Sequence, residues 1–310
     1  EPTQEDYDHK LIQLTVQMHR SSPDDDYTMS ISTERALEIF EDLNKNFPNL
    51  ERVDFAGGEV LYQKQFFPAL EKLAEHPNAK HMKIIFHSNF NADFDPVRLS
   101  ELLHNFGNVH IQISVDAGPR IYAYFRDGDW EKLKSNIAAF KAADNNHCEL
   151  NIVYTTGTYQ LMEIKDAMLN FLELDINYID ASIIYTPSYL NPSVMMLKHR
   201  YKVLNDIEET RNEIIKVDKQ RRQHLEETSK LCSYHVMEEV KEYPLWSDTM
   251  SAIKSLETIR SYILNHDSNS QDWKSFMKYI ERTDELWQQS FNEHFVNYQY
   301  VNGEVVNVSS

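Results

Sequence analysis

The sequence predicts an α/β fold followed by a mostly helical C-terminal region, and three observations support this. Short apolar segments with β-forming character alternate with segments of helical periodicity up to about residue 185. Six strand candidates alternate with helix candidates, which implies parallel pairing through right-handed crossovers. From Val194 onward the sequence is almost continuously helical in character. The alternation fits both an open doubly wound sheet and a barrel, whole or partial.

Each element is predicted from its local pattern. The first helix is expected to begin near Ser32 or Thr33, because a hydroxyl there can cap free backbone N–H groups and apolar residues follow at helical spacing. Pro68 weakens the second helix, since proline interrupts helix interiors. The predicted strands are 11–16, 52–56, 82–87, 109–115, 148–156 and 176–185, and the helices between them are 32–46, 64–75, 97–106, 129–143 and 161–174.

The pattern changes after the proline-containing segment 185–193, so we place a domain boundary at about residue 190. This predicts one domain at 1–190 and a helical extension at 191–310. Helices are expected within 205–227, 233–243, 249–266 and 272–295, and an extended tail is expected at 301–310.

Composition narrows the classes of partner and compartment. The formal net charge is -18, which argues against broad binding to nucleic acid or anionic membranes. No apolar run approaches the ~20 residues of a membrane span. The two cysteines exclude a disulfide framework and fit a reducing compartment. We therefore expect a cytoplasmic protein whose acidic C-terminal helices contact a protein or peptide partner.

Candidate ligand-binding residues follow the predicted strands, because ligands of parallel α/β folds bind at the carboxyl ends of strands. Gly57, Gly58 and Glu59 come directly after the second strand, within FAGGEVL. Glycine lets backbone approach a ligand closely, and a carboxylate accepts hydrogen bonds from an ammonium group. A tight turn capped by Glu59 explains the same residues without a ligand.

The next two strand ends add further polar residues. Ser88 and Asn89 follow the third strand, where they can contact a ligand or form a turn. Ser114 and Asp116 follow the fourth strand, and Gly118 is expected to permit an unusual backbone conformation.

Arg126 lies shortly downstream, within YFRDGDW. Its guanidinium can pair with a neighbouring carboxylate or with the carboxylate of a ligand.

Together these segments resemble the radical S-adenosylmethionine (radical SAM) superfamily over roughly residues 10–185. FAGGEVL, HSNF and SVDAG followed by YFRDGDWEKLKSNI are similar to its Gly-Gly-Glu-Pro motif, its Thr-Asn-Gly-like turn and its Ser-(Ile/Leu)-Asp-Gly strand end. The resemblance implies a partial (β/α)6 TIM-like barrel and is closest to members with a twitch-type extension. It also implies that Gly57, Gly58 and Glu59 hold the amino group of SAM. Ser114 and Asp116 would lie near its ribose, and Arg126 near its carboxylate.

The sequence departs from the family at the residues that make it reactive. The family's [4Fe–4S] cluster is held by Cys-x3-Cys-x2-Cys after the first strand, and cysteine thiolates are the ligands that such clusters require. Segment 17–30 contains no cysteine, and Cys148 and Cys232 lie elsewhere. Val60 replaces the motif's proline. The sequence therefore supports SAM as a possible ligand but does not support a [4Fe–4S] cluster.

Three hypotheses remain open. The first is a pseudoenzyme that retains the barrel as a binding or scaffold protein and keeps a SAM-like pocket. The second is a genuine radical SAM enzyme, modifying a peptide or small molecule, whose cluster-binding loop is missing around residues 16–17 of this sequence. The third gives the barrel unrelated acid–base chemistry through Glu59, Asp116 and His87. No catalytic residue is assigned.

Other metal sites are weakly indicated. A solvated acidic loop explains Asp24, Asp25 and Asp26 better than a metal site with Met18 and His19 does. Cys232 and His235 would supply only two ligands, and His147 and Cys148 point to opposite faces of a strand. No metal site is assigned.

Overall fold

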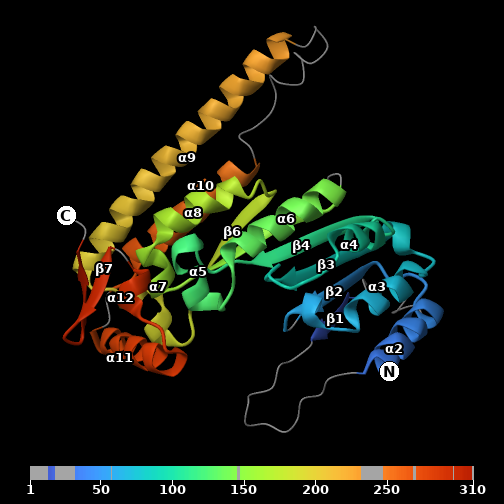
Figure 1. Cartoon of the computed structure of the whole chain (residues 1–310), viewed down its shortest axis with the longest axis horizontal. Helices are drawn as coiled ribbons and strands as arrows, with labels where there is room; N and C mark the ends of the chain where they lie inside the picture. The colour runs from blue at the N-terminus through green and yellow to red at the C-terminus, as the bar shows by residue number, and fades with distance from the viewer. Residues whose placement is uncertain are drawn as a thin grey trace. The chain divides into compact units, whose positions relative to one another are not determined.

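A computed structural model describes residues 13–17, 32–56, 58–144, 147–231, 247–267, 270–295 and 297–308. Six strands follow one another in chain order in one sheet, and helices alternate with them along the chain (Figure 1). The helices that follow the sixth strand form most of the C-terminal region. The predicted α/β fold with a helical C-terminal region is confirmed. The domain boundary at residue 190 stays a prediction.

Backbone contacts divide the chain into two compact units, and each is described by itself. One unit holds the described residues up to Ser114 together with 131–151. The other holds residues 115–130 and the described residues from 152 onward.

The first unit contains four parallel strands, and side chains of the last three lie in its core. Val53, Ile84 and Val109 are in register across three neighbouring strands, and all are fully or almost fully buried. Burial on this scale explains why these strands are rich in Val, Ile and Phe. The strands are β1 (Gln13–Gln17), β2 (Arg52–Ala56), β3 (Lys83–Ser88) and β4 (Asn108–Ser114).

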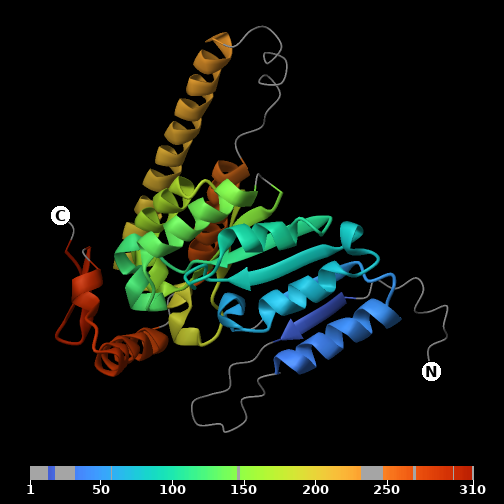
Figure 2. The ribbon, with the colours of Figure 1, turned by 45° about the vertical axis from the view of Figure 1, so that its right-hand side comes forward.

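The helices of this unit begin within two residues of their predicted starts. Ser32 caps the first, and its hydroxyl accepts a 3.2 Å hydrogen bond from Arg35 N–H. Pro68 lies in the first turn of α3, where no intrahelical partner for an N–H is needed, so the helix tolerates it. Helices α2 and α3 lie side by side in both views (Figures 1 and 2). The bounds are α2 (Thr33–Asn46), α3 (Phe66–Ala74), α4 (Pro96–Leu103) and α6 (Trp130–Asp144).

The second unit is mostly helical. Its 35-residue helix α9 is the longest described element.

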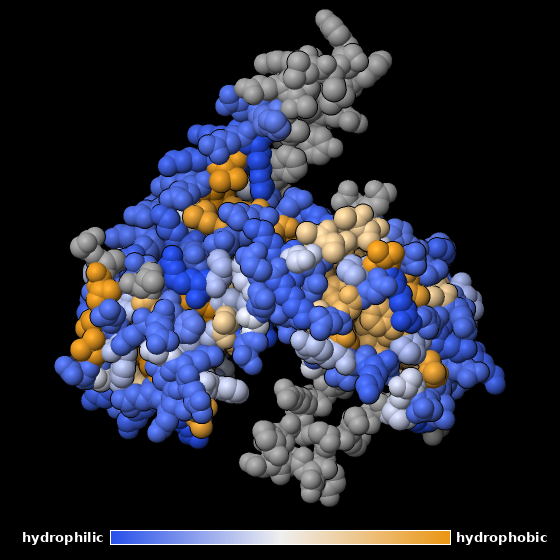
Figure 3. Space-filling view, viewed as in Figure 1, coloured by the Kyte–Doolittle hydropathy of each residue, from blue (hydrophilic) through white to orange (hydrophobic). Residues whose placement is uncertain are grey.

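Hydrophilic residues of the chain predominate on the face drawn in Figure 3, and no described helix is both long and apolar enough to cross a membrane. The elements of the second unit are β5 (Glu149–Thr156, which begins in the first unit), β6 (Tyr178–Ile183), α5 (Pro119–Arg126), α7 (Thr158–Met162), α8 (Ile164–Glu173), α9 (Leu197–Leu231), α10 (Ser247–Asn265), α11 (Ser270–Trp287), α12 (Phe291–His294), β7 (Tyr298–Val301) and β8 (Glu304–Asn307).

Several elements differ from the sequence prediction. Helix α5 was not predicted. The single helix expected at 161–174 is two helices that meet at Glu163, whose φ of -125° is not helical. The expected extended tail is a β-hairpin, in which Asn302 and Gly303 adopt φ angles of 51° and 81°. Both angles suit the tight two-residue turns that join antiparallel strands. The helix predicted at 233–243 lies outside the described residues.

Candidate functional site

The end of β2 positions Glu59 through a short irregular turn. Gly57 lies outside the described residues, while Gly58 adopts φ +60°, a conformation that side chains disfavour. Glu59 then caps a short 3-10 helix at Val60–Tyr62, and its Oε1 accepts a 3.1 Å hydrogen bond from Leu61 N–H. Val60, which stands where the family motif has proline, is fully buried and begins this helix, a position that also suits proline.

The end of β3 supplies two further donors to the same carboxylate. Ser88 Oγ donates to Glu59 Oε1 at 2.6 Å, and Asn89 N–H donates to Glu59 Oε2 at 2.6 Å. The structure thus brings together three of the predicted site residues. Glu59, Ser88 and Asn89 are called the Glu59 cluster below.

The same two residues also build a turn, as the alternative interpretation predicts. Ser88 Oγ accepts a 2.9 Å hydrogen bond from Phe90 N–H, and Asn89 Oδ1 accepts one of 2.9 Å from Asn91 N–H. Both polar side chains therefore help to hold the loop after β3, and the hydroxyl hydrogen of Ser88 is already donated to Glu59. The group that they present is the carboxylate of Glu59.

That carboxylate retains capacity for one more donor. A carboxylate offers about four acceptor positions, and three are used by Leu61, Ser88 and Asn89. Its half-buried position limits competition from water. Because three donors orient it, Glu59 can receive an ammonium group without first reorganising.

In the second unit, Asp116 and Arg126 form an ion pair. Arg126 Nη2 lies 2.6 Å from Asp116 Oδ2, and Thr155 N–H donates to Asp116 Oδ1 at 3.4 Å. Burial raises the pKa of Asp116, while the positive charge of Arg126 opposes the shift. Of the two roles predicted for Arg126, the structure contains the pairing with a neighbouring carboxylate.

Arg126 also has an unused donor. Its Nε is buried and lacks a hydrogen-bond partner within the described part of the chain. An unpaired buried donor costs about 1–3 kcal/mol, so an acceptor at this position would stabilise the protein.

Ser114, the last residue of β4, is half-buried and belongs to the first unit.

Gly118 corrects a sequence prediction. Its φ of -74° and ψ of 174° are ordinary extended values, so no unusual conformation requires glycine. The requirement is space. A Cβ at this position would lie 2.5 Å from Asp166 Oδ2 and 2.8 Å from Ala167 Cα. Gly118 therefore lets the start of α5 pack directly against α8.

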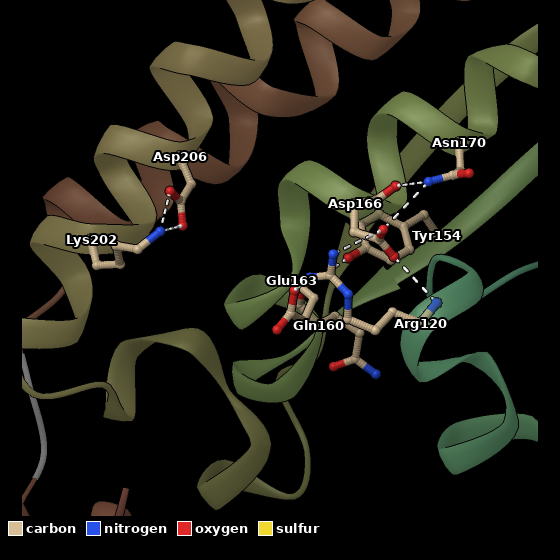
Figure 4. A network of polar contacts seen from close by, with 8 residues as sticks. All are labelled: Arg120, Tyr154, Gln160, Glu163, Asp166, Asn170, Lys202 and Asp206. Atoms are coloured by element: carbon tan, nitrogen blue, oxygen red, sulfur yellow. Dashed lines mark hydrogen bonds and ion pairs between the residues drawn. The ribbon is translucent and has the colours of Figure 1, made fainter. Parts of the chain in front are cut away.

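A polar network around Arg120 was not predicted from the sequence (Figure 4). Arg120 Nη1 lies 2.7 Å from Glu163 Oε2, and Arg120 N–H donates to Asp166 Oδ2 at 3.4 Å. Glu163 is 3% exposed, and burial raises its pKa to about 7 despite the nearby guanidinium. No local sequence pattern indicates that Glu163 is buried in a polar network. Glu163 lies at the break between α7 and α8, and this break was not predicted.

The residues present do not fit the family's iron–sulfur cluster. Such a cluster requires three thiolates from this motif, and the whole sequence contains two cysteines. Cys148 is buried beside Asp144. Burial and the interaction with the Asp144 carboxylate both raise the pKa of its thiol. The other candidate ligands lie outside the described residues: Met18, His19, Asp24, Asp25, Asp26, Cys232 and His235. Where the chain is described, no group of three or more His, Cys, Asp or Glu side chains could hold a metal ion.

Comparison with known proteins identifies one family. The model of the radical SAM superfamily matches residues 16–180. No curated protein matches the chain.

Solved structures resemble the chain at low identity. SuiB from Streptococcus suis has 14% identity over 67% of this chain and 47% of its own, with a TM-score of 0.43. anSMEcpe with bound AdoMet has 16% identity over 60% and 53%, with a TM-score of 0.43. The radical S-adenosylmethionine methyltransferase TsrM from Kitasatospora setae has 10% identity over 52% and 30%, with a TM-score of 0.39. The chain thus spans only about a third to a half of the length of these structures.

Proposed function

Because this chain belongs to the radical SAM superfamily, we propose that it binds S-adenosylmethionine, or a closely related nucleoside, as a binding protein without radical chemistry. The observation that carries the proposal is the carboxylate of Glu59, which three donors hold in place. Membership of the family indicates the class of ligand, and the Glu59 cluster supplies a carboxylate that fits the ammonium group of that ligand.

The chemical argument rests on charge and preorganisation. An ammonium group donates to a carboxylate through a charge-assisted hydrogen bond, which contributes about 1.5–3 kcal/mol. The donors around Glu59 are neutral, so they orient the carboxylate without cancelling its charge. The ligand's ammonium would provide the missing positive charge.

Within the second unit, we propose separately that Arg126 can pair with a carboxylate of a ligand, as the family resemblance implies. Its Nε has a free hydrogen, while Asp116 holds the other side of the guanidinium. In this proposal Asp116 orients Arg126 and neutralises part of its charge.

The proposal that radical chemistry is absent rests on the cysteine count. A [4Fe–4S] cluster, where family members hold one, supplies the electron that cleaves SAM. With two cysteines in the sequence, the three-thiolate motif cannot be formed by this chain. No reaction step is therefore assigned to these residues.

Calorimetric titration with SAM tests the binding proposal. We expect Glu59→Gln to weaken SAM binding by at least about tenfold, because the amide keeps the shape but loses the charge. Binding of 5′-methylthioadenosine, which lacks the amino-acid part, should be unaffected by this substitution. Glu41→Gln, at an exposed position on α2, is the matched control. Unchanged SAM affinity in Glu59→Gln, or no SAM binding by the wild type, would overturn the proposal.

Iron and sulfide analysis after anaerobic purification tests the absence of radical chemistry. We expect no iron above background in a protein whose intact mass matches the sequence. About four irons per chain would instead support the alternative, a radical SAM enzyme whose cluster-binding residues are not within this sequence.

A further inference from the structure

The outer edge of β6 is covered by hydroxyl groups over the first half of the strand. Ile179 N–H donates to Ser251 Oγ at 2.9 Å, and Ala181 N–H donates to Ser255 Oγ at 3.1 Å. Ser255 Oγ donates in turn to Ile179 C=O at 3.1 Å. The two serines are four residues apart, so they lie on one face of α10. Helix α10 thus occupies a strand edge that would otherwise present unpaired backbone groups.

This cover ends before the strand does. Ile184 N–H donates to Thr156 C=O at 3.0 Å on the inner side of β6. Since successive residues of a strand direct their backbone groups to opposite sides, Ile183 faces outward like Ile179 and Ala181. Across the described residues, no hydrogen bond joins α10 to Ile183. The next hydroxyl along the helix, that of Thr258, donates to Lys254 C=O at 3.0 Å.

A groove lies beside this uncovered end. Its volume is about 500 Å³, and it lies between Ile183 and Tyr185 on one side and the second half of α10 on the other. We call it the β6–α10 groove. Its other principal lining residues are Lys254, Thr258, Tyr262 and His266.

Aromatic rings form one wall of the groove. The Tyr185 side chain, with a residue exposure of 67%, meets Tyr262 edge-to-face with ring centroids 5.8 Å apart. Tyr262 stacks on His266 at 3.9 Å, and its hydroxyl is held by Asn191 at 3.0 Å. A fixed aromatic surface of this kind can pack against apolar side chains with little loss of conformational entropy.

The lining of the groove contains one cation, Lys254, and one anion, Glu257. Lys254 is exposed and has no carboxylate within ion-pair distance among the described residues. Glu257, the acidic residue of the lining, lies 3.9 Å from Arg211. A cation is thus available in a chain whose net charge is -18. An acidic group on a ligand would be complementary to it.

We propose that the β6–α10 groove binds an extended, acidic peptide segment of a partner protein by strand addition. The backbone of the peptide pairs with the outward-facing groups of Ile183, where the cover by α10 ends. One side chain packs on Tyr185 and Tyr262, and an acidic side chain pairs with Lys254. This proposal is independent of SAM binding by the Glu59 cluster.

A displayed library of random seven-residue peptides is the probe. The wild-type protein is used for selection, and the double variant Tyr185→Ala, Lys254→Glu is used for counter-selection. Both positions are exposed, so the variant should fold. We expect acidic, β-forming peptides that bind the double variant at least tenfold more weakly. Arg260→Glu, an equal charge change on α10 outside the groove, should leave their affinity within twofold of wild type.

Hydrogen exchange distinguishes strand addition from other modes of binding. A selected peptide should slow exchange at the amide of Ile183, and its N-methylated form should not bind. The proposal is overturned if no peptide depends on Tyr185 and Lys254, or if N-methylation leaves the affinity unchanged. It is also overturned if sedimentation shows that the groove is covered by a second copy of the chain.

Discussion

The hydroxyl of Ser88 donates a 2.6 Å hydrogen bond to Oε1 of Glu59, although 29 residues separate them in the chain. The contact exists because β2 and β3 are parallel neighbours, so that residues beyond their carboxyl ends lie close together. Ser88 is buried and also accepts from Phe90 N–H. One hydroxyl therefore links the loop after β3 to the carboxylate after β2.

Replacing Ser88 should affect both stability and ligand binding. Ser88→Ala leaves Phe90 N–H buried without its acceptor, which should lower the free energy of unfolding by about 1–3 kcal/mol. It also removes one donor that orients Glu59, so SAM affinity should fall several-fold. Asn89→Ala is the comparison, because the backbone N–H of this residue, and not its side chain, contacts Glu59. Urea unfolding and SAM calorimetry measure the two effects. Equal SAM affinities in the two variants would contradict the role given to Ser88.

Two glycines should respond differently to the same substitutions. Gly58 has φ +60°, so Gly58→Ala should cost about 1–2 kcal/mol and Gly58→Asn less, since asparagine tolerates this conformation. Gly118 needs space, so both Gly118→Ala and Gly118→Asn should cost about 1–3 kcal/mol or more, with asparagine the worse. Chemical denaturation of the four variants tests this. A milder effect of asparagine than of alanine at position 118 would show that conformation, and not space, requires glycine there.

Glu163 should make stability depend on pH. Its pKa rises from 4.5 to about 7 in the folded protein, so the folded state binds the proton more tightly than the unfolded state. Its contribution is therefore present below about pH 4.5 and is lost as pH rises to about 7. Relative to wild type, Glu163→Gln should gain up to about 3 kcal/mol of stability across this range.

The charged groups near Glu163 are Arg120, Asp166 and Asp206. Unfolding by urea at pH 5, 6, 7 and 8 measures the difference between variant and wild type. Glu285→Gln, at an exposed position on α11, should show no such trend. A constant difference between Glu163→Gln and wild type at all four pH values would contradict the shift.

Arg200 should resist replacement by lysine. Its residue exposure is 7%, and its guanidinium donates to the carbonyl groups of Ser193 at 2.5 Å and Met195 at 2.9 Å. It also donates to the carbonyl groups of Ile263 and His266 near the end of α10. A lysine ammonium cannot reach several carbonyls with the same planar geometry. Arg200→Lys should therefore lower the free energy of unfolding by about 3 kcal/mol or more.

Thermal and urea unfolding measure the effect of Arg200→Lys. The control is Arg260→Lys at an exposed position of α10, which should stay within about 0.5 kcal/mol of wild type. A loss in Arg200→Lys no larger than in this control would show that the four carbonyl contacts contribute little to stability.

Local sequence patterns were sufficient for most of the fold. Strand β2 and helix α2 begin within a residue of their predicted starts, because side-chain periodicity and capping are local properties. Helix α5 has local signals as well, a proline at its first position and an arginine in its last turn, but its eight residues are too few for a clear period. The hairpin at the C-terminal end was predictable from Asn302 and Gly303, a pair that favours such turns.

The candidate site, too, was predictable only in its local features. By itself, the sequence determined which residues follow the strands and which family they resemble, because the order and spacing of motifs are properties of the sequence. Only the tertiary structure decided what those residues contact. Ser88 holds Glu59, Asp116 holds Arg126, and Gly118 makes room for α8. These relationships join residues that are distant in sequence, or depend on the space between two elements, so no local pattern contains them.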